Sequence, residues 1–170
     1  MTEAERPTLR ILFWNVNGQP RSELIAALCE ENQVDVLVVA EWDYPPNEIV
    51  LALANRGIAM RWTGESDSRL HCFSVPLLKT REIYTNISGK LAIYQFQWQS
   101  IKFLLAATHL LSGMSTETDD RDVEATKVAD EVRQKENERS NHRTIAIGDF
   151  NLNPFNRGLA QAIGFHGVMT

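Results

Sequence analysis

The sequence predicts an α/β domain in which two stacked, mixed β-sheets are flanked by helices. Three almost continuously apolar runs, at 9–16, 34–40 and 144–147, have the composition of strands buried on both faces. The segment 58–98 contains short alternating runs of apolar and polar residues, which are typical of antiparallel strands. Two sheets stacked face to face accommodate both kinds of strand.

Length and composition indicate one folded domain. The chain has 170 residues, of which 44% are hydrophobic and 23% are charged, ordinary values for a globular protein. We expect this domain to span residues 9–170 and to follow a flexible tail at 1–8. No apolar run reaches the roughly 20 residues that cross a bilayer, and the first residues lack the apolar core of a secretory signal. The expected location is therefore cytoplasmic, with no membrane partner.

Charge and cysteine content narrow the function only slightly. A formal net charge of −5 argues against a broad basic face that grips long nucleic acid. It is compatible with an enzyme that acts on phosphates through a bound cation, because such sites gather acidic residues. Cys29 and Cys72 stand alone, without zinc spacing, so we expect buried reduced thiols, and a disulfide is the less favoured interpretation.

The first two thirds of the chain alternate strands with helices and then continue as strands alone. Apolar residues at helical spacing predict an amphipathic helix over 22–32, and a second helix is expected over 48–56. From Ile58 onward the short strands suggest an antiparallel meander with polar turns. The strands expected in this region are 58–62, 70–75, 82–87, 91–98 and 101–107.

The last third combines a charged helix with the third buried strand. Over 122–139, Val123, Val128 and Val132 supply a narrow inward stripe for an exposed helix. A buried strand follows at 144–147, and Pro154 suits the start of another helix.

Asp149 and Asn151 follow that last strand. Side chains alternate along an extended backbone, so these two are expected to share a face while Phe150 turns into the core. A carboxylate and a carboxamide projecting together make a plausible reaction centre, although the same residues are common in ordinary turns.

Polar residues close four of the expected strands. Each alone has an ordinary explanation, as a solvated cap, a satisfied structural histidine or part of a turn. Together they favour a functional site, because catalytic groups gather where strands end in loops on a rigid scaffold. These residues are Asn15 with Asn17, Glu41, His109, and Asp149 with Asn151.

The motifs that contain these residues resemble the endonuclease/exonuclease/phosphatase superfamily, which has the deoxyribonuclease I-like fold. The resemblance is carried, in order, by Trp14-Asn15-Val16-Asn17, the strand ending in Glu41, Thr108-His109-Leu110 and Gly148-Asp149-Phe150-Asn151. It covers nearly the whole chain from Leu9 onward. It implies a four-layer α/β/β/α sandwich and metal-dependent hydrolysis of phosphoesters.

The resemblance also implies roles for the matching residues. Glu41 and Asn15 would hold Mg²⁺ or Mn²⁺, which prefers hard oxygen ligands, and Asn17 occupies a place where some relatives carry an acidic metal ligand. Asp149 would orient or deprotonate the attacking water, and Asn151 would contact that water or a phosphate oxygen. His109 would stabilise a nonbridging oxygen of the phosphate.

The end of the chain departs from the family pattern. Relatives continue through further strands to a terminal Ser-Asp-His element, and His166 does not match it. The last strands of the family fold are therefore expected to be absent, which would leave the strand at 9–16 with an unpaired apolar edge. A truncated chain, completion by another chain or a second copy, and an inactive derivative all remain open.

The substrate is expected to be nucleic acid, contacted by loops beside the strand ends. Arg69, Arg121 and Trp42 are the candidate contacts, within or next to the loops at 64–70 and 112–121. One alternative function is a catalytically inactive or trans-complemented binding module of the same fold. Another is a phosphoesterase acting on small molecules or lipids. No serine-hydrolase elbow and no P-loop is present in the sequence.

Overall fold

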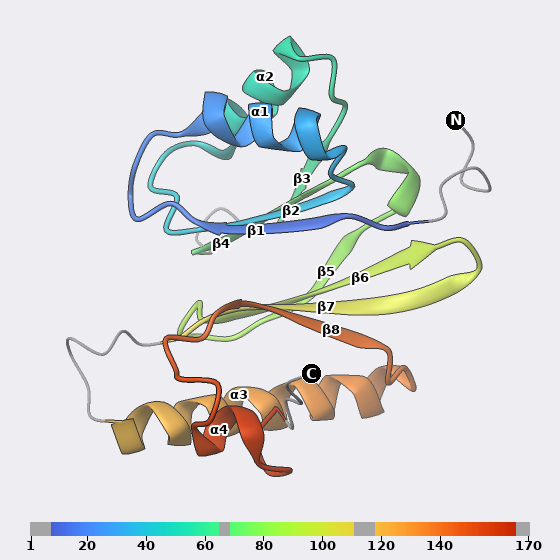
Figure 1. Cartoon of the computed structure of the whole chain (residues 1–170). Helices are drawn as coiled ribbons and strands as arrows, with labels where there is room; N and C mark the ends of the chain where they lie inside the picture. The colour runs from blue at the N-terminus through green and yellow to red at the C-terminus, as the bar shows by residue number, and fades with distance from the viewer. Residues whose placement is uncertain (1–7, 65–68, 111–117, 166–170) are drawn as a thin grey trace.

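The computed structural model describes residues 8–64, 69–110 and 118–165. In this part of the chain, two four-stranded sheets lie face to face, with two helices on the outer face of each (Figure 1). The expected four-layer α/β/β/α sandwich is therefore confirmed. The expected tail falls almost wholly on residues 1–7, which lie outside the described residues.

The first sheet has the strand order β1-β2-β4-β3. β1 pairs with β2 in parallel, and β4 pairs antiparallel with both β2 and β3. The helix α1 (Ser22–Asn32) has the expected bounds, whereas α2 (Pro46–Asn55) begins two residues before the expected start. The strands are β1 (Ile11–Asn15), β2 (Val36–Ala40), β3 (Arg61–Thr63) and β4 (Leu70–Ser74).

The second sheet has the strand order β5-β6-β7-β8. β5, β6 and β7 form an antiparallel meander, and β8 returns parallel to β7 after the long helix α3 (Thr118–Arg139). The short helix α4 (Arg157–Ala160) starts three residues after Pro154. The strands are β5 (Arg81–Thr85), β6 (Leu91–Trp98), β7 (Ile101–His109) and β8 (Thr144–Asp149).

The single meander expected for the central segment is wrong, because its strands are divided between the two sheets. β3 and β4 belong to the first sheet, and the chain then crosses to the second through the 3₁₀ turn η2 (Pro76–Leu78). Pro76 has no N–H to continue a strand ladder, so the pairing stops at β4. Ile87, expected at the end of a strand, lies beyond β5 and is fully exposed.

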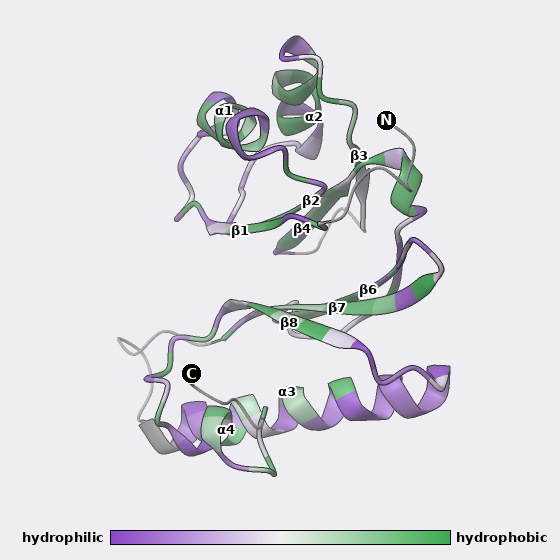
Figure 2. Ribbon diagram, turned by 45° about the vertical axis from the view of Figure 1, so that its right-hand side comes forward, coloured by the Kyte–Doolittle hydropathy of each residue, from purple (hydrophilic) through white to green (hydrophobic). Residues whose placement is uncertain are grey.

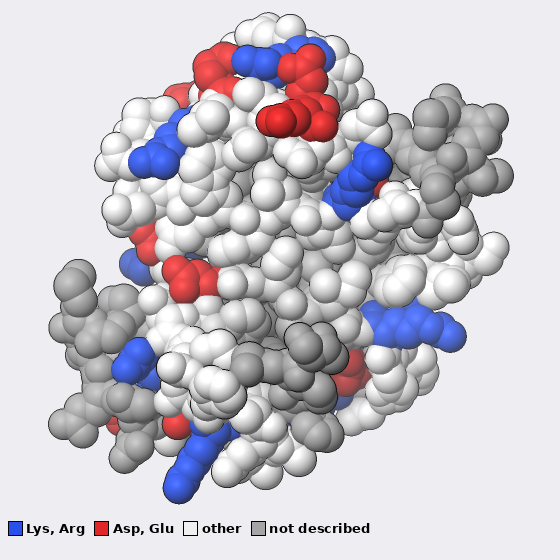
Figure 3. Space-filling view, in the orientation of Figure 1, with Lys and Arg blue, Asp and Glu red and all other residues white. Residues whose placement is uncertain are grey.

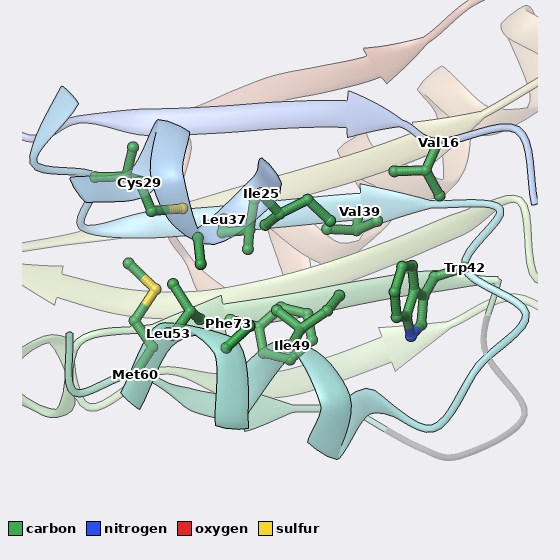
Figure 4. Close-up of a cluster of buried hydrophobic side chains, with 13 residues drawn as sticks. Val16, Ile25, Cys29, Leu37, Val39, Trp42, Ile49, Leu53, Met60 and Phe73 are labelled. Atoms are coloured by element: carbon green, nitrogen blue, oxygen red, sulfur yellow. The ribbon is translucent and has the colours of Figure 1, made fainter. Parts of the chain in front are cut away.

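Three apolar clusters hold the layers together. One lies between the first sheet and its helices (Figure 4), one between the two sheets, and one between the second sheet and α3. β2 serves two of them, since Leu37 and Val39 face the helices while Val36 and Val38 face the other sheet. Full burial of β2 on both faces matches its continuous apolar sequence.

The inward face of α3 differs from the one expected. Val128 and Val132 are buried, but Val123 is 52% exposed, so its assignment to the inward stripe is wrong. Ala125 and Ala129 complete the buried face, at a spacing that repeats every three to four residues. The rest of the helix is strongly hydrophilic (Figure 2). No helix in the described part of the chain is long and apolar enough to cross a membrane.

One edge strand of each sheet lies on the same side of the molecule. β1 is the last strand of the first sheet and β8 is the last strand of the second, and they lie one above the other (Figure 1). Ile11 and Phe13 of β1, together with Ile145 and Ile147 of β8, pack against the cluster between the sheets but are only partly buried. The expected unpaired edge at β1 is therefore present among the described residues, and β8 provides a second.

The two cysteines are free and buried, as expected. Cys29 lies under the helices of the first sheet, and Cys72 lies between the sheets. Burial raises the pKa of the Cys29 thiol to about 11, so this thiol stays protonated near neutral pH.

Candidate active site

Four predicted site residues meet at one end of the sandwich. Asn15 ends β1, Glu41 follows β2, and His109 and Asp149 end β7 and β8. Parallel pairing aligns Asn15 with Ala40, the residue before Glu41, and aligns His109 with Asp149. Because the carboxyl ends of parallel strands lie at the same edge of a sheet, each sheet contributes two of these side chains.

The amide nitrogen of Asn15 lies at the centre of the group. It donates to Glu41 Oε1 at 3.0 Å and to Asp149 Oδ2 at 3.1 Å, so it bridges carboxylates from the two sheets. His109 Nε2 lies 2.9 Å from the same oxygen of Glu41, which identifies Nε2 as the protonated ring nitrogen. Its 3.4 Å separation from Asn15 Nδ2 then joins two donors and is not a hydrogen bond.

The amide oxygen of Asn15, the atom expected to bind the cation, faces the backbone of Asn17, while the amide nitrogen faces the carboxylates. The oxygen accepts a hydrogen bond of 2.9 Å from the backbone N–H of Asn17. That bond fixes the orientation of the amide and directs its nitrogen toward Glu41 and Asp149. In this arrangement Asn15 holds the two carboxylates in place.

Three site positions have a left-handed backbone. The φ angles are 52° at Asn17, 54° at Glu41 and 48° at Asn151. Asparagine tolerates this region, but a glutamate in it is strained. The side chain of Asn17 is exposed, and its contacts at the site run through its backbone, so the structure does not bring it to the carboxylates.

Asn151 tethers the end of β8 to β7. Its side-chain nitrogen donates to the carbonyl of Leu110 at 2.9 Å, and its backbone N–H donates to Asp149 Oδ1 at 3.1 Å. The expected shared face with Asp149 assumed an extended backbone, which the left-handed φ of Asn151 interrupts. Phe150 does turn into the core, where its ring meets Phe165 edge to face.

A turn that the sequence analysis did not single out supports His109. The carbonyl of Lys90 accepts hydrogen bonds from the backbone N–H of His109 at 2.9 Å and from Thr108 Oγ1 at 3.0 Å. Asn86 Oδ1 accepts from the backbone N–H groups of Lys90 and Leu91 and so closes this turn. The spacing of Asn86 and Gly89 is a turn signal, but nothing in the sequence connects it to His109.

Gly148 is required by the close approach of β7 and β8. A Cβ at this position would lie 2.0 Å from the carbonyl oxygen of Thr108. The glycine of the Gly-Asp-Phe-Asn motif therefore permits the parallel pairing that places Asp149 beside His109.

The three predicted substrate contacts have different outcomes. Arg69 is exposed, and its carbonyl accepts a 3.3 Å bond from the N–H of Glu41, so it lies next to the site. Arg121 donates to the carbonyl of Asn151 at 2.6 Å. Trp42 is only 4% exposed and packs in the cluster under the helices (Figure 4), so its assignment as a substrate contact is wrong. Most of both expected loops, at 65–68 and 111–117, lies outside the described residues.

The donor set fits a magnesium ion that retains most of its water shell. Among the described residues, no group of three or more His, Cys, Asp or Glu side chains is arranged to hold a metal. Mg²⁺ needs only one or two carboxylates in addition to water, and Glu41 with Asp149 supplies them. Two carboxylates held this close repel each other, which favours a cation between them.

The surface charge offers no broad basic face on the side shown in Figure 3, where Lys and Arg side chains are scattered among uncharged ones. An anionic substrate that meets this face would have to be recognised by individual side chains.

Comparison with solved structures finds other proteins with this four-layer α/β/β/α fold. The human Nocturnin catalytic domain with a bound sulfate anion matches with a TM-score of 0.66 at 15% identity, covering 93% of this chain and 71% of that one. D. rerio TDP2 complexed with a single-strand DNA product matches with a TM-score of 0.60 at 19% identity, covering 88% and 63%. Sphingomyelinase C from Streptomyces griseocarneus matches with a TM-score of 0.57 at 16% identity, covering 88% and 66%. The chain thus spans less than two thirds of the length of the last two.

Sequence comparison identifies the family. No curated protein is significantly similar to the chain. The family model described as the Endonuclease/Exonuclease/phosphatase family matches residues 12–164, a range that includes all four residues of the central hydrogen-bonded group. The chain therefore belongs to the Endonuclease/Exonuclease/phosphatase family.

Proposed function

We propose that this protein hydrolyses phosphodiester bonds in nucleic acid, using a water activated at the Asn15–Glu41–His109–Asp149 site and a divalent cation, Mg²⁺ or Mn²⁺. The observation that carries the proposal is the bridging of Glu41 Oε1 and Asp149 Oδ2 by one amide nitrogen, with His109 beside them. Family membership supports hydrolysis of a phosphoester.

Each side chain has a distinct part in the proposed reaction. Asp149 is held by Asn15 and by the N–H of Asn151, and it accepts a proton from the attacking water. His109 donates from Nε2 to a nonbridging oxygen of the phosphate, exchanging its contact with Glu41 for one with substrate. Glu41 is the carboxylate that would hold the cation, which when bound neutralises charge developing on the phosphate.

Nucleic acid is the proposed substrate because Arg69 and Arg121 lie around the strand ends and one structure of the same fold carries a DNA product. The sphingomyelinase C of that fold keeps a lipid phosphodiester as the second candidate. Both substrates present an anionic diester, and the site geometry is the same for either.

The decisive experiment measures cleavage of a labelled single-stranded DNA and an RNA of matched sequence, with Mg²⁺ and with EDTA. We expect cleavage only with the cation, and a loss of about 10³-fold or more for Asp149→Ala and for Glu41→Gln. Glu31→Gln is the matched control, because Glu31 is exposed on α1 away from the site.

Two further substrates and a measurement of DNA binding separate the alternatives. Release of phosphocholine from sphingomyelin without DNA cleavage would replace the nucleic-acid assignment by the lipid one. Turnover of para-nitrophenyl phosphate alone would indicate a small-molecule phosphatase. DNA binding without cleavage under any cation condition, unaffected by Glu41→Gln, would identify a binding module and overturn the proposal.

A further inference from the structure

The turn that supports His109 is itself attached to helix α3 by an ion pair. Lys90 Nζ is bonded to Glu124 Oε1, which joins the residue before β6 to the second turn of α3. The two side chains are only 23% and 16% exposed, so water and salt screen the pair less than they screen a surface ion pair. The contact therefore holds the turn more firmly than an exposed pair would.

The ion pair lies beside the apolar contact between α3 and the second sheet, whose outer face α3 covers (Figure 1). Leu91 follows Lys90 and Ala125 follows Glu124, and both of these neighbours are fully buried in the same cluster. Because a close-packed interior resists displacement, the backbone beside each charged residue has a defined position. The helix thus gives Glu124 a fixed base from which it holds Lys90.

The backbone of Lys90 is in direct contact with the site. Its carbonyl accepts a bond of 2.9 Å from the N–H of His109 and one of 3.0 Å from Thr108 Oγ1. The ring carried by this anchored backbone places Nε2 2.9 Å from Glu41 Oε1. Since a hydrogen bond weakens steeply when its geometry is lost, a displacement of Lys90 is passed on to the contact between His109 and Glu41.

A neighbouring contact of α3 supports the other strand end of the second sheet. Arg121, three residues before Glu124, donates to the carbonyl of Asn151 at 2.6 Å, and the N–H of Asn151 donates to Asp149 Oδ1 at 3.1 Å. Residues three apart in a helix lie on one face. One face of α3 therefore contacts the supports of both His109 and Asp149.

We propose that Glu124 is a positioning residue for His109 and acts through Lys90. The ion pair holds the turn before β6 against α3, so the Lys90 carbonyl keeps the His109 ring in line with Glu41. Glu124 has no contact with the reacting atoms in this role. The inference rests on the proposed function only for the part that His109 plays in hydrolysis, because the state of its ring is measurable without turnover.

The first test reads the ring nitrogens of His109 by NMR of ¹⁵N-histidine-labelled protein, in EDTA and at one fixed pH where an ordinary histidine is neutral. The signals are assigned by their loss in His109→Gln. In the parent we expect the proton on Nε2, because Glu41 accepts from that atom. In Glu124→Gln and Lys90→Met we expect the signals to move toward the tautomer mixture of free imidazole.

Lys135→Met is the matched control for this measurement. Its ammonium pairs with Glu138 inside α3, and its side chain is 19% exposed, close to the value for Lys90. The variant removes an ion pair of the same helix without touching the turn at Lys90, so the His109 signals should stay as in the parent.

The second test measures kcat and KM for cleavage of the labelled DNA. We expect Glu124→Gln to lower kcat about tenfold and to change KM less than about twofold, because a displaced His109 loses its contact chiefly in the transition state. Lys90→Arg keeps the charge and should behave as the parent does. The double exchange Lys90→Glu with Glu124→Lys restores the pair and should recover both kcat and the His109 signals relative to Glu124→Gln.

Unchanged His109 signals in both Glu124→Gln and Lys90→Met would overturn the inference, whatever those variants do to turnover. Signals that move equally in Lys135→Met would also overturn it, because a general loosening of α3 would then explain them. A parent chain that cleaves no substrate would overturn the proposed function alone, since the ring signals still decide the role of Glu124.

Discussion

At the scale of single residues, the candidate active site contains one strained backbone position and two carboxylates that repel each other. Glu41 has a left-handed backbone, and its carboxylate shares the amide nitrogen of Asn15 with Asp149. Both features cost stability when no cation is present, since the backbone conformation disfavours a glutamate and the two charges repel. Strain of this kind is maintained where the surrounding structure enforces it, as the strand ends do here.

We expect Glu41→Asn to stabilise the protein in EDTA while abolishing cleavage. Asparagine tolerates the left-handed region and removes one charge, so a gain of about 1 kcal/mol, or a Tm rise of roughly 2–4 °C, is expected by thermal denaturation. Ser140→Asn is the control, because Ser140 has a φ of 49° on the exposed side of α3's end. It should raise Tm as well but leave cleavage intact. A lower Tm for Glu41→Asn would show that the contacts of Glu41 outweigh its strain.

His71 gives the protein a pH dependence of its own. The ring is 3% exposed, and burial lowers its pKa from the ordinary 6.5, against a smaller opposing effect of a backbone hydrogen bond at Trp42. The unfolded chain therefore binds this proton at a higher pH than the folded one, so stability falls as pH drops below 6.5.

Replacing His71 by leucine should remove that acid-side loss. We expect the Tm of His71→Leu to fall less than that of the parent between pH 6.5 and the depressed pKa, as followed by circular dichroism. His142→Gln, which alters an exposed histidine, should keep the parent's pH profile. Parallel pH profiles for the parent and His71→Leu would mean that the ring titrates normally in the folded state.

At the scale of elements, local sequence patterns predicted where helices and strands lie. They did not predict which strands pair with one another. The alternating run at Leu91–Trp98 and the apolar spacing of Ser22–Asn32 gave the bounds of β6 and α1, because periodicity reports which face is buried. The division of β3–β7 between two sheets depends on the crossing at η2, which pairs residues distant in sequence. The same limit applies to Trp42, which packs among the helices of the first sheet, and to Val123, which stays exposed on α3 while Val128 and Val132 meet the second sheet.

The motif residues were predictable, whereas their contacts were not. Asp149, His109 and Glu41 were found because each closes an apolar strand and matches a family motif. The orientation of the Asn15 amide depends on a backbone N–H two residues later, and the tether of Asn151 depends on a left-handed turn. Neither leaves a periodic signal in the sequence.

Gly148→Ala tests the pairing of β7 and β8 at the site. The added Cβ would lie 2.0 Å from the Thr108 carbonyl, so the strands must separate, and we expect a loss of about 3 kcal/mol or more in urea denaturation. Gly57→Ala is the comparison, because it has a φ of 74° but nothing within 4 Å, and it should cost only about 1 kcal/mol. Equal losses for the two variants would contradict the close approach.

At the scale of the whole molecule, each sheet of the described part of the chain has two edge strands, and β1 and β8 are the pair that lie on one side (Figure 1). β1 and β8 end the sheets on one side, with partly buried apolar residues facing the gap between the sheets. Exposed strand edges pair readily with other strands. This is the position at which a completing chain or a second copy would add to the sheets.

We expect the purified chain to associate with itself through these edges in a concentration-dependent way. Ile11→Lys places a charge where an added strand would pack and should reduce the association seen by sedimentation velocity. Ile101→Lys, which is 40% exposed at the far end of β7, should not. A parent chain that stays monomeric at high concentration would show that these edges are not adhesive.

The crossing from one sheet to the other at η2 also separates the site residues into two halves of the sequence. Asn15 and Glu41 precede the crossing, and His109 and Asp149 follow it, so the chain carries half of its reactive centre on each side of Pro76. If the chain is cut there, the proposed function predicts two fragments that are inactive alone and hydrolyse phosphodiesters only after their apolar faces reassemble. The fold is thus suited to conversion into a split reporter, in which restored turnover signals that two fusion partners have met.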